Sequence, residues 1–375
     1  MAFADGGTNL VSQATQGSQV FVAQRPLPLG VAIGSGVGSE STTDGRNVPI
    51  NTPYLGFTGG TLVAHGDVNG DGNAELVTST GAGGTAHIAE LVTSTGAGGT
   101  AHIIVFDYLT GSMVASFFGY PPAFLGGVNV SVGDVNGDGY GDIACGVGVG
   151  GGPNVRIFDG KQILAGNYSL QPLSAGGALI ASFYAYPEAF TGGIRVAAAD
   201  VNNDGYADLV CAVGSGGGPN VRVFDGRQLT LGNTSLAEVG QGGALIGSFY
   251  GLPSTFTGGL FVAAGDVNND GFADVIVGVE SGGGPNVRAF DARTGGLLLS
   301  IYALDPTLTG GVRVASTDWN GDGYDDLIVG TGPGAPGRQI RVISGKDGAT
   351  ESDSFMPFSF RGNSTLPGGS DVYLG

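Results

Sequence analysis

Five segments of the chain repeat one acidic pattern, D-x-N-x-D-G-x-x-[DE], whose side-chain oxygens could bind a hard cation. Positions one, three, five and nine of each copy offer three carboxylates and one Asn amide. Calcium takes roughly six to eight oxygen ligands, and Gly at position six permits the sharp turn that such a loop needs. A single copy could be an ordinary hairpin turn, but five copies in register favour calcium.

We therefore predict about five Ca²⁺ sites, each formed by positions one, three, five, seven and nine. Position seven varies in side chain, which suits a backbone carbonyl ligand. Ligation by oxygen alone disfavours zinc and copper, whereas magnesium remains an alternative. The expected ligands are Asp67, Asn69, Asp71, Asn73 and Glu75; Asp134, Asn136, Asp138, Tyr140 and Asp142; Asp200, Asn202, Asp204, Tyr206 and Asp208; Asp266, Asn268, Asp270, Phe272 and Asp274; and Asp318, Asn320, Asp322, Tyr324 and Asp326.

The charge of the chain is accounted for largely by these loops. The net charge is −18, and the loops hold 15 of the 32 acidic residues, so five calcium ions would bring the charge to about −8 (−18 plus 10). Much of the acidity is therefore expected to be metal ligand, and no binding of nucleic acid or anionic lipid by charge is expected.

The sequence also carries expectations about location. No apolar run reaches the roughly 18 residues of a membrane span, so membrane insertion is not expected. The start, M-A-F-A-D-G-G, shows no basic region followed by an apolar stretch, so no signal peptide is expected in this chain. Calcium is abundant enough for weak sites outside the cell, which predicts an extracellular or cell-surface location. Cys145 and Cys211 lie at equivalent positions of adjacent repeats and are expected to be buried and unbridged.

The sequence around the loops predicts a β-propeller. Short apolar runs such as D-L-V-C-A-V-G follow the loops, G-G-G-P-N-V-R-x-F-D then occurs three times, and a further run such as A-L-I-A-S-F-Y follows. No stretch shows sustained helical periodicity. Four strands in a period of about 50 residues are typical of propeller blades. We predict an all-β fold, a six-bladed β-propeller of four-stranded antiparallel blades with the metal loop between strands one and two; seven blades is the alternative.

The expected organisation is one domain, residues 1–375, whose ring is closed by a blade shared between the two ends. G-G-S-D-V-Y-L-G at the C-terminus resembles a first strand, and Asp5 and Asn9 would occupy positions five and nine of a degenerate sixth loop, with Met1 and Phe3 at positions one and three. The expected blades are approximately 61–125, 126–191, 192–257, 258–309, 310–367, and 368–375 joined to 1–60.

Two irregularities interrupt the repeat. The segment A-E-L-V-T-S-T-G-A-G-G-T-A-H-I occurs twice in tandem, at 74–88 and 89–103, and inserts near 161–176 and 227–242 lengthen two other repeats. We expect Glu75, rather than Glu90, to complete the first metal loop, and the second copy to lead into the next strand.

The chain resembles the FG-GAP (VCBS-like) repeat family, which includes the propeller of integrin α chains and bacterial secreted proteins. The D-x-N-x-D-G-x-x-D loops and G-P-G-A-P at Gly332–Pro336 carry the resemblance, and F-T-G-G replaces the Phe-Gly pair at Phe57, Phe190 and Phe256. It covers essentially the whole chain, although integrin-type propellers have seven blades. The resemblance implies calcium-dependent extracellular recognition, adhesion or scaffolding, and some fungal lectins are also similar.

Residues outside the loops suggest no enzyme. The three His residues, His65, His87 and His102, match no catalytic motif, and His65 is interpreted as packing or polar support. The glycine-rich loops lack the Lys and helix start of a phosphate-binding loop. No catalytic residue and no cofactor besides Ca²⁺ is expected.

Two further sets of residues recur between repeats, and each has two interpretations. The recurring arginines would pair with a blade Asp such as Asp159, or form a ring that binds carboxylates or sugar hydroxyls; they are Arg156, Arg222, Arg288 and Arg341. The recurring aromatics would form the core between blades, the favoured interpretation, or stack on a sugar or partner side chain; they are Tyr120, Phe124, Tyr186 and Phe190.

The function predicted from the sequence is a non-enzymatic, calcium-stabilised extracellular recognition, adhesion or scaffold module. Its partner would be a protein or glycan ligand. The alternatives are a calcium-dependent carbohydrate-binding lectin and a carbohydrate-active enzyme resembling a polysaccharide lyase. Self-association is also compatible with the low charge and the glycine-rich apolar surface.

Overall fold

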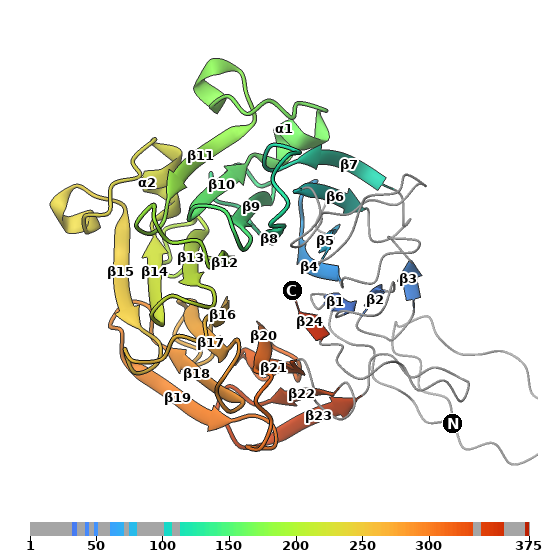
Figure 1. Cartoon of the computed structure of the whole chain (residues 1–375), viewed down its shortest axis with the longest axis vertical. Helices are drawn as coiled ribbons and strands as arrows, with labels where there is room; N and C mark the ends of the chain where they lie inside the picture. The colour runs from blue at the N-terminus through green and yellow to red at the C-terminus, as the bar shows by residue number, and fades with distance from the viewer. Residues whose placement is uncertain are drawn as a thin grey trace, which may run out of the picture.

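The computed structural model describes residues 32–35, 42–44, 49–51, 61–70, 75–80, 101–106, 113–332, 339–355 and 372–374. The described strands pair into four-stranded antiparallel sheets that are arranged around a common centre (Figure 1). The innermost strand of each sheet contacts the innermost strand of the next. The predicted all-β propeller with four-stranded antiparallel blades is thereby confirmed.

Five sheets follow the chain in sequence order. The first contains β4 (Thr61–Gly66), β5 (Glu75–Thr80), β6 (His102–Phe106) and β7 (Met113–Phe118). The second contains β8 (Val128–Gly133), β9 (Asp142–Val147), β10 (Asn154–Phe158) and β11 (Leu179–Tyr184). The third contains β12 (Ile194–Ala199), β13 (Asp208–Val213), β14 (Asn220–Phe224) and β15 (Leu245–Tyr250).

The fourth contains β16 (Leu260–Gly265), β17 (Asp274–Val279), β18 (Asn286–Phe290) and β19 (Leu297–Tyr302). The fifth contains β20 (Val312–Thr317), β21 (Asp326–Thr331), β22 (Ile340–Ile343) and β23 (Glu351–Phe355). A further sheet joins both ends of the chain, in the order β24 (Val372–Leu374), β1 (Ala32–Ser35), β2 (Thr42–Asp44) and β3 (Pro49–Asn51). Its strand β24 contacts β4 on one side and β20 on the other.

Burial changes from strand to strand within a blade. The second strands β9, β13, β17 and β21 are buried at every residue, which agrees with their continuous apolar sequence. From Leu298 onward, the outer strand β19 alternates between exposed and half-buried residues because one of its faces meets solvent.

Aromatic pairs join successive blades in the core. Phe117 of β7 lies edge-on to Phe158 of β10 at 5.0 Å between ring centroids, and Phe183 of β11 meets Phe224 of β14 at 4.9 Å. Edge-to-face packing of this kind favours a fixed geometry between blades. Cys145 and Cys211 are buried and free, as predicted.

The two inserts contain short helices that the sequence analysis did not anticipate. They are α1 (Gly160–Leu164) with η1 (Leu173–Ala175), and α2 (Gly226–Thr230) with η2 (Val239–Gln241). Asp159 and Asp225 cap α1 and α2 by accepting hydrogen bonds from Gln162 N and Gln228 N, both at 2.8 Å. Five residues are too few for helical periodicity to show in the sequence. No helix in the described ranges is long and apolar enough to cross a membrane.

The tandem duplication is resolved at its two ends. Glu75 begins β5, whereas His102 and Ile103 of the second copy begin β6, so the second copy leads into the next strand as predicted. Other predicted features lie outside the described residues: Met1, Phe3, Asp5, Asn9, Phe57, Asp71, Asn73, His87 and Glu90.

Candidate metal centres

Each acidic loop lies between the first and second strands of its blade. The ninth residue opens the second strand in the same register every time, with Asp142 opposite Gly133 and Asp208 opposite Ala199. Glu75 lies opposite Gly66 in the first blade, so its backbone is equivalent to the ninth position. This register supports Glu75, rather than Glu90, as the last residue of the first loop.

The first-position carboxylate shapes the loop by accepting backbone hydrogen bonds. Asp134 Oδ1 accepts from Gly137 N at 2.8 Å and from Asp138 N at 3.0 Å, and its Oδ2 accepts from Gly139 N at 2.9 Å. Asp318 makes the same three bonds, and Asp200 and Asp266 make the last two. The loop is therefore curled around this carboxylate.

The ninth-position carboxylate is buried and ties the loop to its blade. Asp142 Oδ2 accepts from Val135 N at 2.9 Å, and Oδ1 accepts from Gly160 N at 3.0 Å. Burial raises the pKa of Asp142 and of Asp208 to about 8, of Asp274 to about 7 and of Asp326 to about 6. A neighbouring cation would oppose this effect because positive charge favours the ionised carboxylate.

The third-position Asn presents an acceptor that the protein leaves unused. Within the described part of the chain, Oδ1 of Asn202, Asn268 and Asn320 is buried and has no hydrogen-bond donor. An acceptor of this kind costs about 1–3 kcal/mol when it is unsatisfied. In the second loop, Asn136 Oδ1 accepts from Asp138 N at 2.9 Å instead. Amide oxygens are calcium ligands, so three of these loops contain an atom that fits the predicted ion.

The fourth position needs a left-handed backbone, which sequence reasoning missed. The φ angles are 72° at Gly70 and Gly137, 56° at Asn203, 57° at Asn269 and 76° at Gly321. Only Gly, and to a lesser degree Asn, adopts this conformation at small cost. This backbone requirement explains why the fourth position of the motif is Gly in three loops and Asn in the other two.

In four of the loops, a basic side chain from the segment after the third strand of the blade packs on the seventh-position aromatic ring. Lys161 lies 4.8 Å from the Tyr140 ring centroid, and its Nζ is 3.6 Å from Asp138 Oδ2. Arg293 lies 3.9 Å from the Phe272 ring centroid and pairs with Asp270. Arg227 and Lys346 approach Tyr206 and Tyr324 in the same way, at 5.8 and 4.8 Å. The seventh-position aromatic thus has a packing role, which the varying side chain had not suggested.

The loops are also joined to one another. The eighth-position N–H of a loop donates to the first-position carbonyl of the preceding loop, as in Ala207 N to Asp134 O at 2.7 Å and Asp325 N to Asp266 O at 2.8 Å. Gly141 N to Asp67 O and Ala273 N to Asp200 O complete the series at 2.5 and 3.1 Å. We call this run of bonds the loop belt. It uses backbone groups only, so the variable eighth residue gave no signal.

In the described part of the loops, the carboxylates are not gathered around one point. Among the described residues, no three Asp, Glu, His or Cys side chains form a group that could hold a metal ion. The first- and ninth-position carboxylates are occupied by backbone N–H groups, and the fifth-position Asp138 and Asp270 face basic side chains. The carboxylate and amide oxygens of the loops are of the type that calcium prefers. In the described arrangement, the first- and ninth-position carboxylates accept hydrogen bonds from the protein's own backbone.

The recurring arginines bridge blades, and the expected pairing with Asp159 was wrong. Arg156 Nη1 donates to Gly119 O at 2.8 Å, Arg222 Nη1 to Ala185 O at 2.6 Å and Arg288 Nη1 to Gly251 O at 3.2 Å. Arg341 Nη1 donates to Ala303 O in the same way. Each acceptor directly follows the outer strand of the preceding blade. Asp159 is unavailable to Arg156 because it caps α1 and accepts from Asn136 Nδ2 at 3.1 Å.

The recurring tyrosines belong to the core between blades, as favoured from the sequence. Tyr120 and Tyr186 are buried, and the Tyr120 hydroxyl donates to Cys145 O at 2.7 Å and to Asn154 O at 2.9 Å. Burial raises the pKa of both hydroxyls well above the usual value. Phe124 and Phe190 are half-buried and pack against the same core.

A second polar cluster on the innermost strands was not anticipated. Arg195 of β12 pairs with Glu280, which directly follows β17, and its guanidinium lies 4.9 Å from the ring centroid of Phe261 on β16. Arg313 of β20 is buried against the same ring at 4.1 Å. The sequence shows these residues only as isolated charges because their proximity depends on three separate blades.

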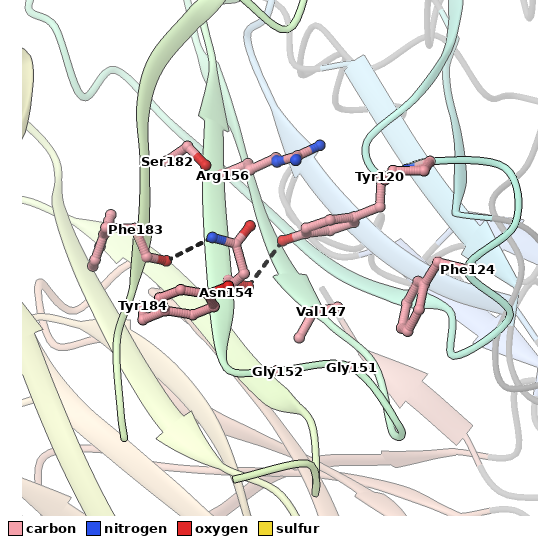
Figure 2. A pocket seen from close by; sticks show the side chains of 11 residues that line it. Tyr120, Phe124, Val147, Gly151, Gly152, Asn154, Arg156, Ser182, Phe183 and Tyr184 are labelled. Atoms are coloured by element: carbon pink, nitrogen blue, oxygen red, sulfur yellow. Dashed lines mark hydrogen bonds between the residues drawn. The ribbon is translucent and has the colours of Figure 1, made fainter. Parts of the chain in front are cut away.

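A cavity of about 520 Å³ is lined by residues of the first two blades (Figure 2). It lies where β9 ends at Val147 and β10 begins at Asn154, whereas the metal loop precedes the other end of β9, at Asp142. It is lined by the turn that follows β7, the glycine-rich turn before β10, and residues of β10 and β11. Tyr184 and Phe124 lie on its two sides, with Asn154 between them (Figure 2).

Sequence comparisons identify repeats of a known type. The FG-GAP-like repeat matches residues 200–277 and 266–329, and the FG-GAP repeat matches residues 126–158. Integrin alpha-7 of Mus musculus and of Homo sapiens is 30% identical over 154 residues, 37% of this chain and 12% of the relative. Integrin alpha-V of Gallus gallus is 30% identical over 227 residues, 54% of this chain and 20% of the relative. The chain therefore spans a fifth or less of the length of these relatives.

Solved structures with some likeness include the Dos1 propeller and the V. cholerae biofilm matrix protein Bap1. The Dos1 propeller has a TM-score of 0.39 and 11% identity over 72% of this chain and 50% of that chain. Bap1 has a TM-score of 0.38 and 18% identity over 79% of this chain and 38% of that chain.

Proposed function

Because this chain is a β-propeller that carries FG-GAP repeats, we propose that it is a non-enzymatic, calcium-stabilised recognition or adhesion module acting outside the cell. The single observation that carries the calcium part is the buried Oδ1 of Asn202, Asn268 and Asn320, which has no donor among the described residues. The similarity to integrin α chains supports recognition or adhesion. A protein or glycan partner would bind the face opposite the loops.

The residues that would hold calcium are those of positions one, three, five, seven and nine. Calcium would supply positive charge to the three carboxylates of each loop, and it would give the buried Asn oxygen a partner. The fifth-position Asp would exchange its basic neighbour for the ion, as Asp138 would with Lys161. At ten times the dissociation constant, each ion would stabilise the fold by about 1.4 kcal/mol.

We also propose that the ring has six blades and is closed by the sheet β24-β1-β2-β3. Antiparallel pairing of Ile33 with Leu374 joins the two ends of the chain in one sheet. The contacts of β24 with β4 and β20 support its place between the first and fifth sheets. Pairing of the ends would remove two exposed strand edges from the ring.

Thermal unfolding in calcium and in EDTA tests the proposal. We expect the melting temperature to be higher in calcium, to return on re-addition after EDTA, and to rise less in magnesium. Asp204→Asn should reduce the calcium-dependent increase, and Glu238→Gln, an exposed acidic residue outside the loops, should not. A melting temperature that is the same in calcium and in EDTA would overturn the structural role of the metal.

A further inference from the structure

Exposed tyrosines recur at one position in three successive blades. Tyr184, Tyr250 and Tyr302 end the outer strands β11, β15 and β19, and their exposed fractions are 47%, 58% and 62%. They differ from the buried tyrosines on which the sequence analysis concentrated, Tyr120 and Tyr186. Three large aromatic side chains left in solvent at equivalent places indicate a repeated contact surface.

Each tyrosine ring is placed by its own blade. Tyr184 lies opposite Asn154 in the strand register, Tyr250 opposite Asn220 and Tyr302 opposite Asn286. The rings lie beside the glycine-rich turn: a Cβ added to Gly152 would stand 3.5 Å from Tyr184 Cε1, and one added to Gly284 would stand 3.0 Å from Tyr302 Cε1. A Cβ at Gly284 would press on the Tyr302 ring, whereas one at Gly152 would make ordinary van der Waals contact with the Tyr184 ring.

The cavity beside Tyr184 adds polar groups to this aromatic surface. Asn154 Nδ2 donates to Phe183 O at 3.0 Å, which orients the carboxamide and leaves its Oδ1 as an acceptor (Figure 2). The Ser182 hydroxyl and Arg156 also line the cavity. Arg156 Nη1 donates to Gly119 O, and its Nε is buried, so the Asn154 carboxamide and the Ser182 hydroxyl are the polar groups that a ligand would meet first.

We propose that the cavity beside Tyr184 and the equivalent surface beside Tyr250 each bind one sugar ring of a neutral glycan. The inference rests on the proposed recognition function and names its ligand class. A sugar's C–H face packs on the electron-rich face of a tyrosine, while its hydroxyls take the acceptor and donors at the ring edge. The cavity volume of about 520 Å³ is in the usual range for small-molecule sites.

The lining offers an acidic sugar no two-point contact with an arginine, which favours a neutral sugar. Among the described residues of the lining, Arg156 alone is charged. Its Nη1 already bonds a carbonyl, and its guanidinium packs 4.7 Å from the Tyr120 ring centroid. It therefore cannot grip a carboxylate with both ends of its fork. A protein partner would need a continuous surface of about 800 Å² per side, whereas separate ring-sized platforms suit a repeating glycan.

The surfaces beside Tyr184, Tyr250 and Tyr302, here called the three platforms, differ in the polar groups that they offer. In the third platform, beside Tyr302, Asn286 Oδ1 accepts from Arg288 Nε at 3.1 Å. This acceptor and this donor therefore bond each other and are not open to a ligand. Leu252 also stands where the first two sites have Tyr120 and Tyr186. Tyr302 should therefore contribute least.

A glycan array of neutral and acidic glycans, probed with the whole chain in saturating calcium, tests the inference. We expect binding to neutral glycans, about tenfold weaker for Tyr184→Ala or Tyr250→Ala, and a larger loss for the double variant because the sites act together on the array. Tyr184→Phe should retain binding because it keeps the ring face. Leu231→Ala, at a site 73% exposed on the insert after α2, is the control and should match the wild type.

Several outcomes would overturn the inference. They are an array with no neutral glycan bound, wild-type binding by the double variant, or loss of binding in Leu231→Ala as well. A displayed peptide library bound through Tyr184, with an empty array, would assign the surface to peptides instead. Melting of each variant in calcium and in EDTA separates the two proposals. If a tyrosine variant loses glycan binding but keeps the calcium-dependent rise in melting temperature, the loss is due to the tyrosine and not to the metal loops.

Discussion

Arg156 donates a hydrogen bond from Nη1 to the main-chain carbonyl of Gly119, which lies 37 residues earlier and on the neighbouring blade. Arg222 and Arg288 reach the carbonyls of Ala185 and Gly251 over the same sequence separation. Each carbonyl belongs to the residue that directly follows an outer strand. A recurring arginine thus serves as a strut between blades, and the strand position that had suggested a binding ring is a structural one.

Removal of one strut should destabilise the protein. Arg222→Met keeps much of the apolar stem but leaves Ala185 O without its donor, at an expected cost of about 1–3 kcal/mol. Urea unfolding in saturating calcium measures the change. Arg227→Met is the matched control, because Arg227 packs on the Tyr206 ring near the surface, and its loss should cost under about 1 kcal/mol. Equal effects of both variants would argue against the strut.

Substitution of a third-position Asn should act differently with and without calcium. Asn268→Ala removes a buried acceptor that has no donor among the described residues, so stability in EDTA should be unchanged or slightly higher. In calcium the same variant should lose the contribution of one site, about 1.4 kcal/mol at ten times the dissociation constant. Paired melting curves in the two conditions check this. Equal destabilisation in both would show that Asn268 serves packing and not a metal.

Acid should weaken the first blade through His102. Burial lowers the pKa of His102 from 6.5 to about 4, and its ring stacks on Phe118 at 4.6 Å and bonds the Ser116 hydroxyl at 3.0 Å. The folded state therefore favours the neutral ring. Its contribution is complete above pH 6.5 and declines as the pH falls from 6.5 towards 4, by at most about 1.4 kcal/mol per unit and less for a partly exposed ring.

The control for this pH effect is the variant His102→Gln. Its unfolding free energy in saturating calcium should fall less than that of the wild type between neutral pH and pH 5. The difference between the two proteins isolates the imidazole from the carboxylates, which are common to both. Parallel pH profiles would exclude His102 as the source.

Several features could be predicted from sequence because they depend on local chemistry. The loop placement between strands one and two follows from the turn-forming D-G dipeptide flanked by apolar runs, and burial of Cys145 and Cys211 follows from their place in those runs. The resemblance of the motifs to FG-GAP repeats was sufficient to identify the repeat type. The backbone register of Glu75 opposite Gly66 agrees with the expected end of the first loop, and the assignment of Glu75 as a metal ligand stays a prediction.

The rest depended on contacts between blades, which a linear pattern does not encode. Arg156 was assigned to Asp159, three residues away, when its acceptor is on another blade. The exposed Tyr184 and the buried Tyr186 are two residues apart and alike in sequence, and only the end of β11 separates their environments. The cluster of Arg195, Glu280 and Phe261 draws on residues up to 85 positions apart.

The loop belt has a consequence for how the protein responds to its surroundings. Asp134 anchors Ala207 of the next loop through its carbonyl while its carboxylate curls its own loop. If calcium binds these loops as proposed, an ion that tightens one loop would shift the anchor of its neighbour, and the effect would pass from blade to blade. The response to falling calcium would then be a threshold, with the sites emptying together over a narrow concentration range. A protein of this kind would keep its shape in a calcium-rich medium and lose it abruptly in a depleted one.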